Sequence, residues 1–410
     1  SAASDVYKRQ LLCSLPYQVV LADELDLPAQ SAIAVEADTG KILYEKDSEK
    51  KRDVGGLSTL LTTYLIFEAI HEKKLSLKDP IKLSEKALAL NDIEGAGTLP
   101  MEANQYTVEQ LLTALLVGNS STAALALAEK VGGSEKSFVE KMKQKLSEWG
   151  IQSPHLINAT GLNTQTISGD PDGKGDENQL SAYDIAVIAK HLLQDFPEVT
   201  KYTSKPTALF SNTQIENPNL MLEGMPNYRS GVDGLRVSNS TKGGITFAAS
   251  TTQNGIHMIT VVLGVEAVDG DPYARFVATS SLMNYVVRTF VSSIVVKEGD
   301  PYGKSKATVM DGKSETVLAV AKKDFYIVEK QGSQAEPKIQ FKSNQESFRA
   351  PVKSGTNLGK LHYTDPDKIG RGYLEDQEPT VDMVSGRTIE KSFFLKVWWN
   401  EFVRYVNEKL

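Results

Sequence analysis

The chain has 410 residues, of which 40% are hydrophobic and 24% charged, with a formal net charge of −7 and an isoelectric point near 5.5. This length exceeds one ordinary domain and predicts two or three, each with its own core. The acidic balance, with no basic stripe and no Gly-rich phosphate loop, argues against nucleic acid as a partner. The five histidines show no metal-ligand spacing, so we expect no metal site and no cofactor.

Residues 1–22 have the features of a signal-peptide remnant. Lys8 and Arg9 precede the apolar run LLCSLPYQVVLA, which ends in the small-residue pattern at which signal peptidase cleaves. The alternative is a buried first strand, but a proline interrupts the run and the acidic DELD follows it at once. We therefore expect a mature chain that begins near Asp23 and lacks the single cysteine, Cys13.

Residues 23–294 are predicted to form one α+β domain. The segment AIAVEADTGKILYE, residues 32–45, alternates apolar and polar residues around Asp-Thr-Gly, which predicts a hairpin with a tight turn. Apolar residues at helical spacing over residues 57–70 predict a hydrophobic helix. Residues 107–132 read as two helical runs interrupted at residues 118–121, and a threonine caps the first run.

The later part of this domain returns to strands. An amphipathic helix opens at Ser181, and Asn254-Gly255 is a hairpin signal between two alternating runs. Residues 273–290 predict a long packed helix. Strands, then helices, then strands and a closing helix indicate helices packed on an antiparallel sheet rather than a parallel doubly wound fold.

The composition shifts near residue 295. Residues 295–387 contain short β-rich runs separated by Gly, Asp, Pro and Lys turns, with almost no helical periodicity. This pattern predicts a small all-β domain whose turn spacing is that of a sandwich.

Residues 388–410 predict an amphipathic membrane-anchor helix. They carry too many charges to span a bilayer, whereas aromatic residues on one face suit a helix that lies in the membrane interface. The alternative is a helix docked on its own domain or in an oligomer seam. The apolar half of the helical wheel holds Phe394, Leu395, Trp398, Trp399, Phe402, Val403, Tyr405, Val406 and Leu410, and the polar half holds Lys396, Asn400, Glu401, Arg404, Asn407 and Glu408.

The order of these features resembles a known family. The phrases AIAVEADTGKILYEKD, YTVEQLL, LALAEK, NYRSGVDGL, YARF and KVWWNEFVRYVNEKL are similar to those of low-molecular-mass penicillin-binding proteins, the serine-type D-alanyl-D-alanine carboxypeptidases. The resemblance runs from about residue 30 to the C-terminus. It implies a penicillin-binding or serine β-lactamase-like domain, followed by a small all-β domain and an amphipathic tail. With the export signal, it also implies a location at the extracytoplasmic face of the bacterial cell membrane.

The first motif of that family, Ser-x-x-Lys, supplies the nucleophile and, one helical turn later, its base. The flanking phrases place this motif on residues 56–59. Gly56 then stands at the nucleophile position and Thr59 at the position of the base. Ser58 is a poor substitute, because two residues along a helix turn its side chain by about 200°, away from the cleft.

The other two motifs are also altered. Ser-x-Asn, which completes proton relay in the family, falls on residues 119–121, with Asn119 and Ser121 in exchanged places. Lys-Thr-Gly, which binds the substrate's terminal carboxylate, falls on Arg236, Val237 and Ser238. Arg236 keeps a cation that can hold a carboxylate through two parallel hydrogen bonds. The alternative is a surface arginine on an eroded cleft.

Literal copies of the motifs occur elsewhere and are expected by chance in a chain rich in Lys and Ser. Residues 48–51 spell Ser-x-x-Lys in a charged loop that we expect to be solvated, and residues 353–355 imitate the third motif inside the β-rich region. Lys242-Gly-Gly lies six residues beyond the family position, where we expect a loop.

The resemblance implies three functional hypotheses. The first is a catalytically inactive carboxypeptidase homologue of peptidoglycan metabolism that binds stem peptides ending in D-Ala-D-Ala, or β-lactams, without covalent chemistry, or that offers a partner surface. The second is an active serine-type carboxypeptidase that removes the terminal D-alanine with residues recruited from elsewhere. The third is a structural or interaction protein whose cleft binds nothing.

Overall fold

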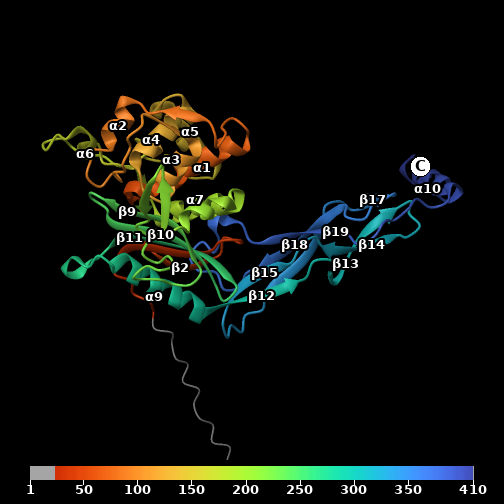
Figure 1. The fold of residues 1–410 in the computed structure, drawn as a ribbon. Coiled ribbons are helices and arrows are strands. Elements are labelled where there is room, and N and C mark those ends of the chain that lie inside the picture. Colours follow the sequence, from red (N-terminus) through yellow and green to blue (C-terminus); the bar gives the residue numbers. More distant parts are fainter. Residues whose placement is uncertain (1–23, 410) are drawn as a thin grey trace, which may run out of the picture.

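The computed structural model describes residues 24–409 and contains two domains in sequence order (Figure 1). The first is a cluster of helices packed on a five-stranded sheet, and the second is an elongated β-rich arm that carries a helix at its far end. The predicted α+β class, followed by a β-rich domain and a C-terminal helix, is confirmed. The predicted signal remnant, residues 1–22 with Cys13, and the predicted mature start at Asp23 lie outside the described residues.

The first domain is built on one antiparallel sheet with the strand order β2-β1-β11-β10-β9. The two predicted hairpins join β1 to β2 and β10 to β11, and the second turns at Asn254 and Gly255, which both have positive φ angles. The strands are β1 (Ala29–Glu36), β2 (Ile42–Lys46), β9 (Val232–Ser240), β10 (Gly244–Gln253) and β11 (Ile256–Val265).

Helices cover both faces of this sheet (Figure 1). α9 (Ala274–Thr289) packs on one face, and α7 (Ala182–Asp195) packs on the other, between the sheet and the helical cluster around α1 (Thr59–His71). Alternate residues of β1 enter the two cores, as Ile33 faces the helical cluster and Ala34 faces α9. A strand covered on both faces is apolar along its length, which explains the almost unbroken buried run of β11.

The helical cluster positions two turns that matter for the site. η1 (Gly55–Ser58) is a 3-10 turn that leads directly into α1, which is buried on nearly all sides. The predicted interruption lies between α3 (Val108–Leu116) and α4 (Ser121–Gly132), where Asn119 has a φ of +55°. Thr107 caps α3 in a capping box, as its sequence position predicted.

Shorter elements complete the first domain. The helical ones are α2 (Glu85–Leu90), α5 (Glu135–Glu148), α6 (Thr164–Ser168), η2 (Pro197–Val199), α8 (Thr200–Thr203) and η3 (Val268–Gly270). The paired strands are β3 (Arg52–Asp53) with β6 (Gln179–Leu180), β4 (Pro80–Lys82) with β5 (Gln105–Thr107), and β7 (Thr207–Phe210) with β8 (Thr213–Glu216).

The second domain has its own apolar core between a six-stranded sheet, β16-β18-β19-β14-β13-β17, and the ribbon β12-β15. A buried ion pair between Lys41 and Asp365, with 2.7 Å between Nζ and Oδ2, joins it to the first domain. Its elements are β12 (Phe290–Val296), β13 (Pro301–Met310), β14 (Thr316–Ala321), β15 (Phe325–Lys330), β16 (Lys338–Ser343), β17 (Phe348–Arg349), β18 (Asn357–Thr364), η4 (Leu374–Asp376) and β19 (Thr380–Ser385).

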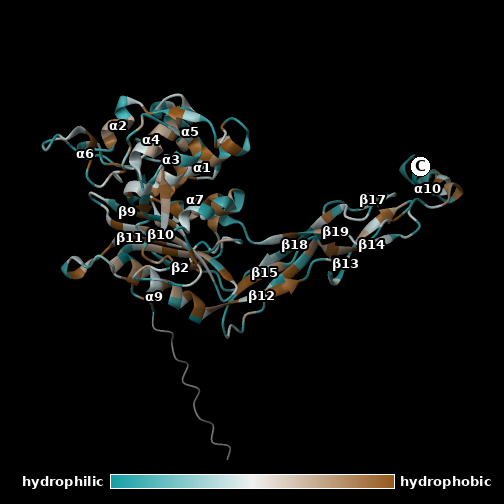
Figure 2. Ribbon diagram, viewed as in Figure 1, coloured by the Kyte–Doolittle hydropathy of each residue, from teal (hydrophilic) through white to brown (hydrophobic). Residues whose placement is uncertain are grey.

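The last helix, α10 (Phe394–Lys409), stands at the tip of the arm and buries none of its residues. Its contact with the arm is polar, because Arg404 donates hydrogen bonds to both carboxylate oxygens of Asp311 at 3.3 and 3.2 Å. Trp398 and Phe402 are exposed, and Figure 2 shows hydrophobic residues on this isolated helix. Within residues 24–409, no helix combines the length and the apolar character needed to cross a membrane.

Candidate functional site

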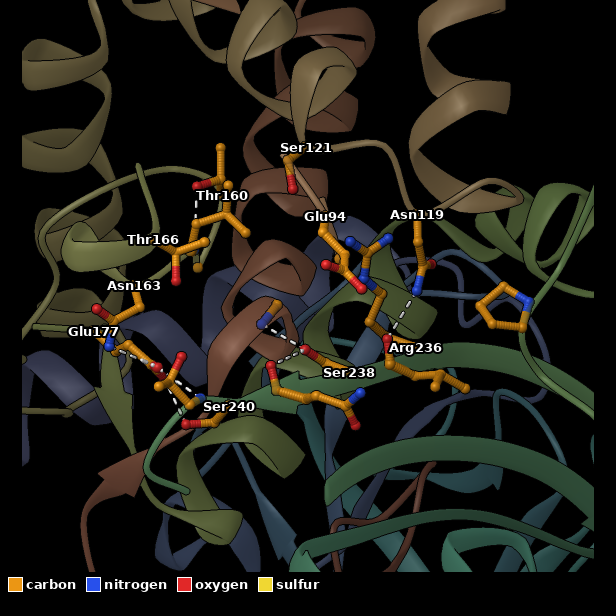
Figure 3. A pocket seen from close by; sticks show the side chains of 18 residues that line it. Glu94, Asn119, Ser121, Thr160, Asn163, Thr166, Glu177, Arg236, Ser238 and Ser240 are labelled. Carbon is orange, nitrogen blue, oxygen red and sulfur yellow. Dashed lines mark hydrogen bonds between the residues drawn. The ribbon is translucent and has the colours of Figure 1, made fainter. Parts of the chain in front are cut away.

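A cavity of about 360 Å³ opens where the start of α1, the loop before α4 and the edge strand β9 meet (Figure 3). The structure brings six of the seven predicted site residues to it, and Thr59 is the one that does not line it. Those six are Gly56, Asn119, Ser121, Arg236, Val237 and Ser238, and the remaining lining residues are Glu94, Gly95, Thr160, Gly161, Leu162, Asn163, Thr166, Glu177, Pro218, Asn239, Ser240 and Thr241.

At the helix end of the cavity, the nucleophile position has no side chain. The backbone N–H of Gly56 donates a hydrogen bond to Ser238 Oγ at 2.7 Å. A Cβ atom added at residue 56 would lie 2.9 Å from that Oγ and 3.6 Å from Nη2 of Arg236. The place that a nucleophilic side chain would need is therefore already in contact with Ser238.

The two hydroxyl groups that follow Gly56 are turned to the backbone. Ser58 is buried, and its Oγ donates to Gly55 O at 3.0 Å and accepts from Asn178 Nδ2 at 2.8 Å. Thr59 donates to Gly56 O at 2.6 Å. Neither residue lines the cavity, as helical geometry predicted for Ser58. These bonds hold the start of α1 in place and leave no hydroxyl of α1 in the cavity.

The loop before α4 contributes the second group. Asn119 adopts a left-handed conformation, which asparagine tolerates, and its Nδ2 donates to Val237 O at 2.9 Å. Its amide therefore ties this loop to β9. Ser121 is buried at the first position of α4, and its side chain points toward the cavity (Figure 3).

Arg236 is the charged group at the strand end. Its side chain is buried, with an exposed fraction of 5%, so the alternative of a surface arginine is wrong. Nη1 donates to Leu115 O at 2.7 Å, whereas buried Nε has no hydrogen-bond partner among the described residues. Burial lowers the pKa of Arg236 to about 10, which still leaves the guanidinium protonated at neutral pH. The arginine therefore keeps its charge at the cavity, where its Nη2 lies 3.6 Å from the place of a Cβ at residue 56.

The strand that carries these residues is fixed from behind by α9. Arg275 is buried, and its Nη1 donates to Ser238 O at 2.7 Å and to Thr246 O at 2.9 Å. Its Nη2 donates to Asn239 Oδ1 at 2.6 Å. Because two carbonyl groups and one side chain share this arginine, the end of β9 has a defined position at the cavity wall.

Sequence reasoning missed the far wall of the cavity. Glu177 is buried there and accepts hydrogen bonds from Asn163 Nδ2 at 3.1 Å, Ser240 Oγ at 2.6 Å and Thr241 N at 2.8 Å. Glu94 adds an exposed carboxylate from another loop. Both acids come from irregular segments without periodicity or motif, so no sequence pattern pointed to them.

The literal motif copies do not line the cavity. Ser48 is buried and donates to Glu45, so the expectation of a solvated loop is wrong for it, and Lys51 pairs with Asp184. Lys242 lies in the turn between β9 and β10, as expected. Residues 353–355 belong to the second domain, and none of these copies is among the lining residues.

The architecture defines the class. Helices on an antiparallel sheet, a cleft between the start of a buried helix and an edge strand, and a β-rich arm behind them form the arrangement of a low-molecular-mass penicillin-binding protein. Residues 18–267 match the D-alanyl-D-alanine carboxypeptidase family, and residues 290–391 match the C-terminal domain of penicillin-binding protein 5. The chain belongs to the D-alanyl-D-alanine carboxypeptidase family, which confirms the resemblance read from its phrases.

Individual relatives agree over most of the chain. The D-alanyl-D-alanine carboxypeptidase DacF of Bacillus subtilis is 28% identical over 346 residues, 82% of this chain and 82% of that protein. The crystal structure of a peptidoglycan synthesis regulatory factor (PBP3) from Streptococcus pneumoniae is 45% identical with a TM-score of 0.85, covering 89% of this chain and 100% of that one. Penicillin-binding protein D2 from Listeria monocytogenes, in its ampicillin-bound form, is 25% identical with a TM-score of 0.54, covering 64% of this chain and 99% of that one.

Proposed function

We propose that this protein is a non-catalytic homologue of D-alanyl-D-alanine carboxypeptidase that acts in peptidoglycan metabolism. It binds the C-terminal carboxylate of a stem peptide, or of a β-lactam, through Arg236 and does not cleave the ligand. The single observation that carries the proposal is a buried guanidinium beside a nucleophile position that holds only hydrogen, with Arg236 Nη2 3.6 Å from the place of a Cβ at residue 56.

The guanidinium supports carboxylate binding on energetic grounds. A buried donor without a partner costs about 1–3 kcal/mol, and more when it is charged. A carboxylate that enters the cavity supplies the opposite charge, which offsets the cost of the buried guanidinium, and Arg–carboxylate pairs are among the strongest hydrogen bonds in proteins. A peptide terminus and a penicillin each present such a group. The relative from Listeria was solved with ampicillin bound, which supports a β-lactam as the second ligand class.

The helix end supports the absence of acyl chemistry. A serine nucleophile needs a base within hydrogen-bond reach, and loss of the nucleophile alone lowers the rate on the order of 10⁶-fold. Three serines, Ser121, Ser238 and Ser240, line the cavity, but no lysine or histidine does among the described residues. Ser240 donates its hydroxyl to Glu177, and Ser238 accepts the N–H of Gly56.

The test is a calorimetric titration with an N-acylated tripeptide, L-Lys-D-Ala-D-Ala, and with the same tripeptide amidated at its C-terminus. The acid should bind the wild-type protein at least about tenfold more tightly than the amide, because an ionised acceptor on Arg236 contributes about 1.5–3 kcal/mol. Arg236→Ala should bind both peptides equally weakly, whereas Arg288→Ala, an exposed arginine on α9, should behave as wild type.

Two results would count against this proposal. Equal binding of the acid by wild type and Arg236→Ala would remove the arginine from the site. No saturable binding of any peptide by the wild type would favour the third hypothesis, a protein whose cleft is empty. If Arg236→Ala folds poorly, the comparison of the acid and the amide peptide on the wild-type protein still tests whether the carboxylate is recognised.

We also propose that α10 holds the protein on the surface of the cell membrane at its extracytoplasmic face. Phe394, Trp398 and Phe402 are exposed on one side of the helix, and Arg404 faces the arm on the other. A large aromatic face opposite a polar one favours the interface of a lipid bilayer. Figure 1 places α10 at the end of the arm remote from the first domain, whose residues line the cavity, so the cavity would stand away from the lipid surface.

The membrane test is a vesicle flotation assay with a shortened chain. The truncation should remove residues 394–410 only, because Ile389 pairs with Val352 and Ser392 N donates to Asp311 O, which are contacts of the arm itself. The full chain should float with anionic vesicles and the truncated chain should not, while Glu401→Gln on the polar face should still float. A truncated chain that still floats would contradict the anchor.

A further inference from the structure

The side chains at positions 56 and 238 are complementary across the cavity. Gly56 lacks the hydroxymethyl group expected at its position, and Ser238 carries one where the third motif of the family has glycine. The Ser238 Oγ lies 2.9 Å from the place of a Cβ at residue 56 and accepts the Gly56 N–H at 2.7 Å. One hydroxyl therefore occupies the space and takes the backbone donor that a reacting site would keep open.

We propose that the Ser238 hydroxyl blocks a hydrogen-bonding position in the cleft that a ligand would otherwise use, and that Ser238 thereby determines specificity. Its hydroxyl oxygen accepts the hydrogen bond of the Gly56 N–H, so this N–H is not available to a carbonyl oxygen of the ligand. The ligand is then recognised by its carboxylate at Arg236. Backbone N–H groups at a nucleophile position are the donors that acyl-transfer sites direct at a ligand oxygen. This inference rests on the proposed function for the identity of the ligand, but not for the state of the Gly56 amide.

The surrounding structure holds the hydroxyl at this point. Ser238 pairs with Thr246 of β10, and its carbonyl oxygen accepts from Arg275 at 2.7 Å and from Thr246 Oγ1 at 3.1 Å. On the opposite side, Gly55 has a φ of +55°, and a Cβ there would lie 2.5 Å from Asn239 O. The turn and the strand are thus packed too closely for Ser238 to leave by a backbone movement, and its Cα–Cβ direction is fixed.

The hydroxyl proton of Ser238 has only a weak partner. Its nearest acceptor is Asn239 O at 3.4 Å, which is long for an O–H donor. Ser238 is thus engaged mainly as an acceptor from Gly56. Removal of the oxygen frees the Gly56 N–H and leaves no strong acceptor unpaired, which makes Ser238→Ala a mild substitution.

The first readout is affinity. Ser238→Ala should bind the N-acylated L-Lys-D-Ala-D-Ala peptide about fivefold more tightly than wild type, because the freed N–H adds one neutral hydrogen bond. Ser281→Ala is the matched control and should not change the affinity, because within residues 24–409 its hydroxyl bonds only to Val277 O of the same helix. Equal or weaker binding by Ser238→Ala would overturn the inference.

The second readout needs no ligand. Carbonyl-¹³C and amide-¹⁵N labelling of glycine selects the Gly-Gly peptide groups, of which the chain has three, at residues 55–56, 132–133 and 243–244. The Gly56 amide should exchange its hydrogen about tenfold faster in Ser238→Ala than in wild type, while the amide of Gly133 keeps its rate. Equal exchange rates at Gly56 would overturn the inference. If no variant binds the peptide, the proposed function fails, and the exchange rate alone decides whether Ser238 masks the amide.

Discussion

The two ends of the cleft differ in what they retain. At the helix end, Gly56 has no side chain and Thr59 bonds back to the turn, so the start of α1 contributes no hydroxyl or amine to the cavity. At the strand end, Arg236 remains a protonated guanidinium whose Nη2 lies 3.6 Å from the place of a Cβ at residue 56. Both ends stand on intact supports, namely the contact of Ser58 with Asn178 at the helix and that of Arg275 with β9. The scaffold is therefore preserved on both sides, and on one side glycine and threonine stand where the family has its nucleophile and base.

This difference shows that the support of a site and its reactive groups have separate energetic roles. A nucleophile and its base contribute to a rate, and natural sites often sacrifice stability for them, so their replacement by glycine and threonine can leave the fold unharmed. A buried cation is the opposite case, because its desolvation costs several kcal/mol unless it is paired. Without a ligand for Arg236, nothing would offset this desolvation free energy. We therefore propose that the strand end binds a ligand.

The largest expected effect is the failure to rebuild the helix end. Gly56→Ser with Thr59→Lys should not release D-alanine from the tripeptide above the uncatalysed rate, a deficit on the order of 10⁶-fold relative to a working serine site. The new Cβ would meet Ser238 Oγ at 2.9 Å, and Asn119 Nδ2 is already committed to Val237 O. Measurable D-alanine release by this double variant, in an enzyme-coupled assay, would contradict this account, because it would show that the helix end supports acyl chemistry once two side chains are restored.

The next effect concerns the support of the strand end. Arg275→Ala should lower the free energy of unfolding by about 3 kcal/mol, because two buried carbonyl groups lose a charged donor. Urea denaturation measures this directly. Arg288→Ala on the same helix should change it by less than about 0.5 kcal/mol, since the bond that Arg288 makes among the described residues is to an exposed carbonyl of its own helix. Similar losses in both variants would mean that Arg275 has no special role.

A smaller effect separates charge from geometry at position 236. Arg236→Lys keeps the positive charge but replaces a planar fork with a point charge, so the acid peptide should bind about tenfold more weakly. Arg236→Ala should lose at least as much. If the lysine variant bound as tightly as wild type, charge alone would account for recognition.

The smallest expected effect is a flat pH profile. Burial sets the pKa of Arg236 at about 10, and a peptide carboxyl group ionises near 3.5, so the ion pair is complete between about pH 5 and 9. Affinity should be constant in that window and should fall only as the pH rises through 10 and the guanidinium loses its proton. No histidine lines the described cavity. A bell-shaped profile centred near neutral pH, measured by titration or by turnover, would indicate a working acid and base.

Much of this comparison was visible in the sequence. Alternating and helical periodicities predict the hairpins, α1 and the interrupted pair α3 and α4, and flanking phrases assign Gly56, Asn119 and Arg236 to the motif positions of the family. The sequence pattern does not predict contacts between residues that lie far apart along the chain. The bond from Ser238 to Gly56 joins residues 182 positions apart, and its existence depends on side-chain packing that no local rule encodes. The burial of Arg236 under α3 was hidden for the same reason.

The sequence carries one signal for the contact between residues 56 and 238. Relative to the family motifs, position 56 lacks a hydroxymethyl group and position 238 gains one. Such a compensating pair of changes indicates that the two side chains face each other. The acids of the far wall, Glu94 and Glu177, gave no such signal, because irregular loops place them and the sequence does not define how those loops fold back.

The most direct test of the central difference is incubation of the full chain with a fluorescent penicillin, followed by denaturing electrophoresis and intact-mass spectrometry. We predict no fluorescent band and an unchanged mass, because the helix end offers no serine that can be acylated, while an excess of the acid peptide still binds in titration. A covalent adduct with the mass of one opened penicillin would contradict this account and would identify an active serine in the cleft.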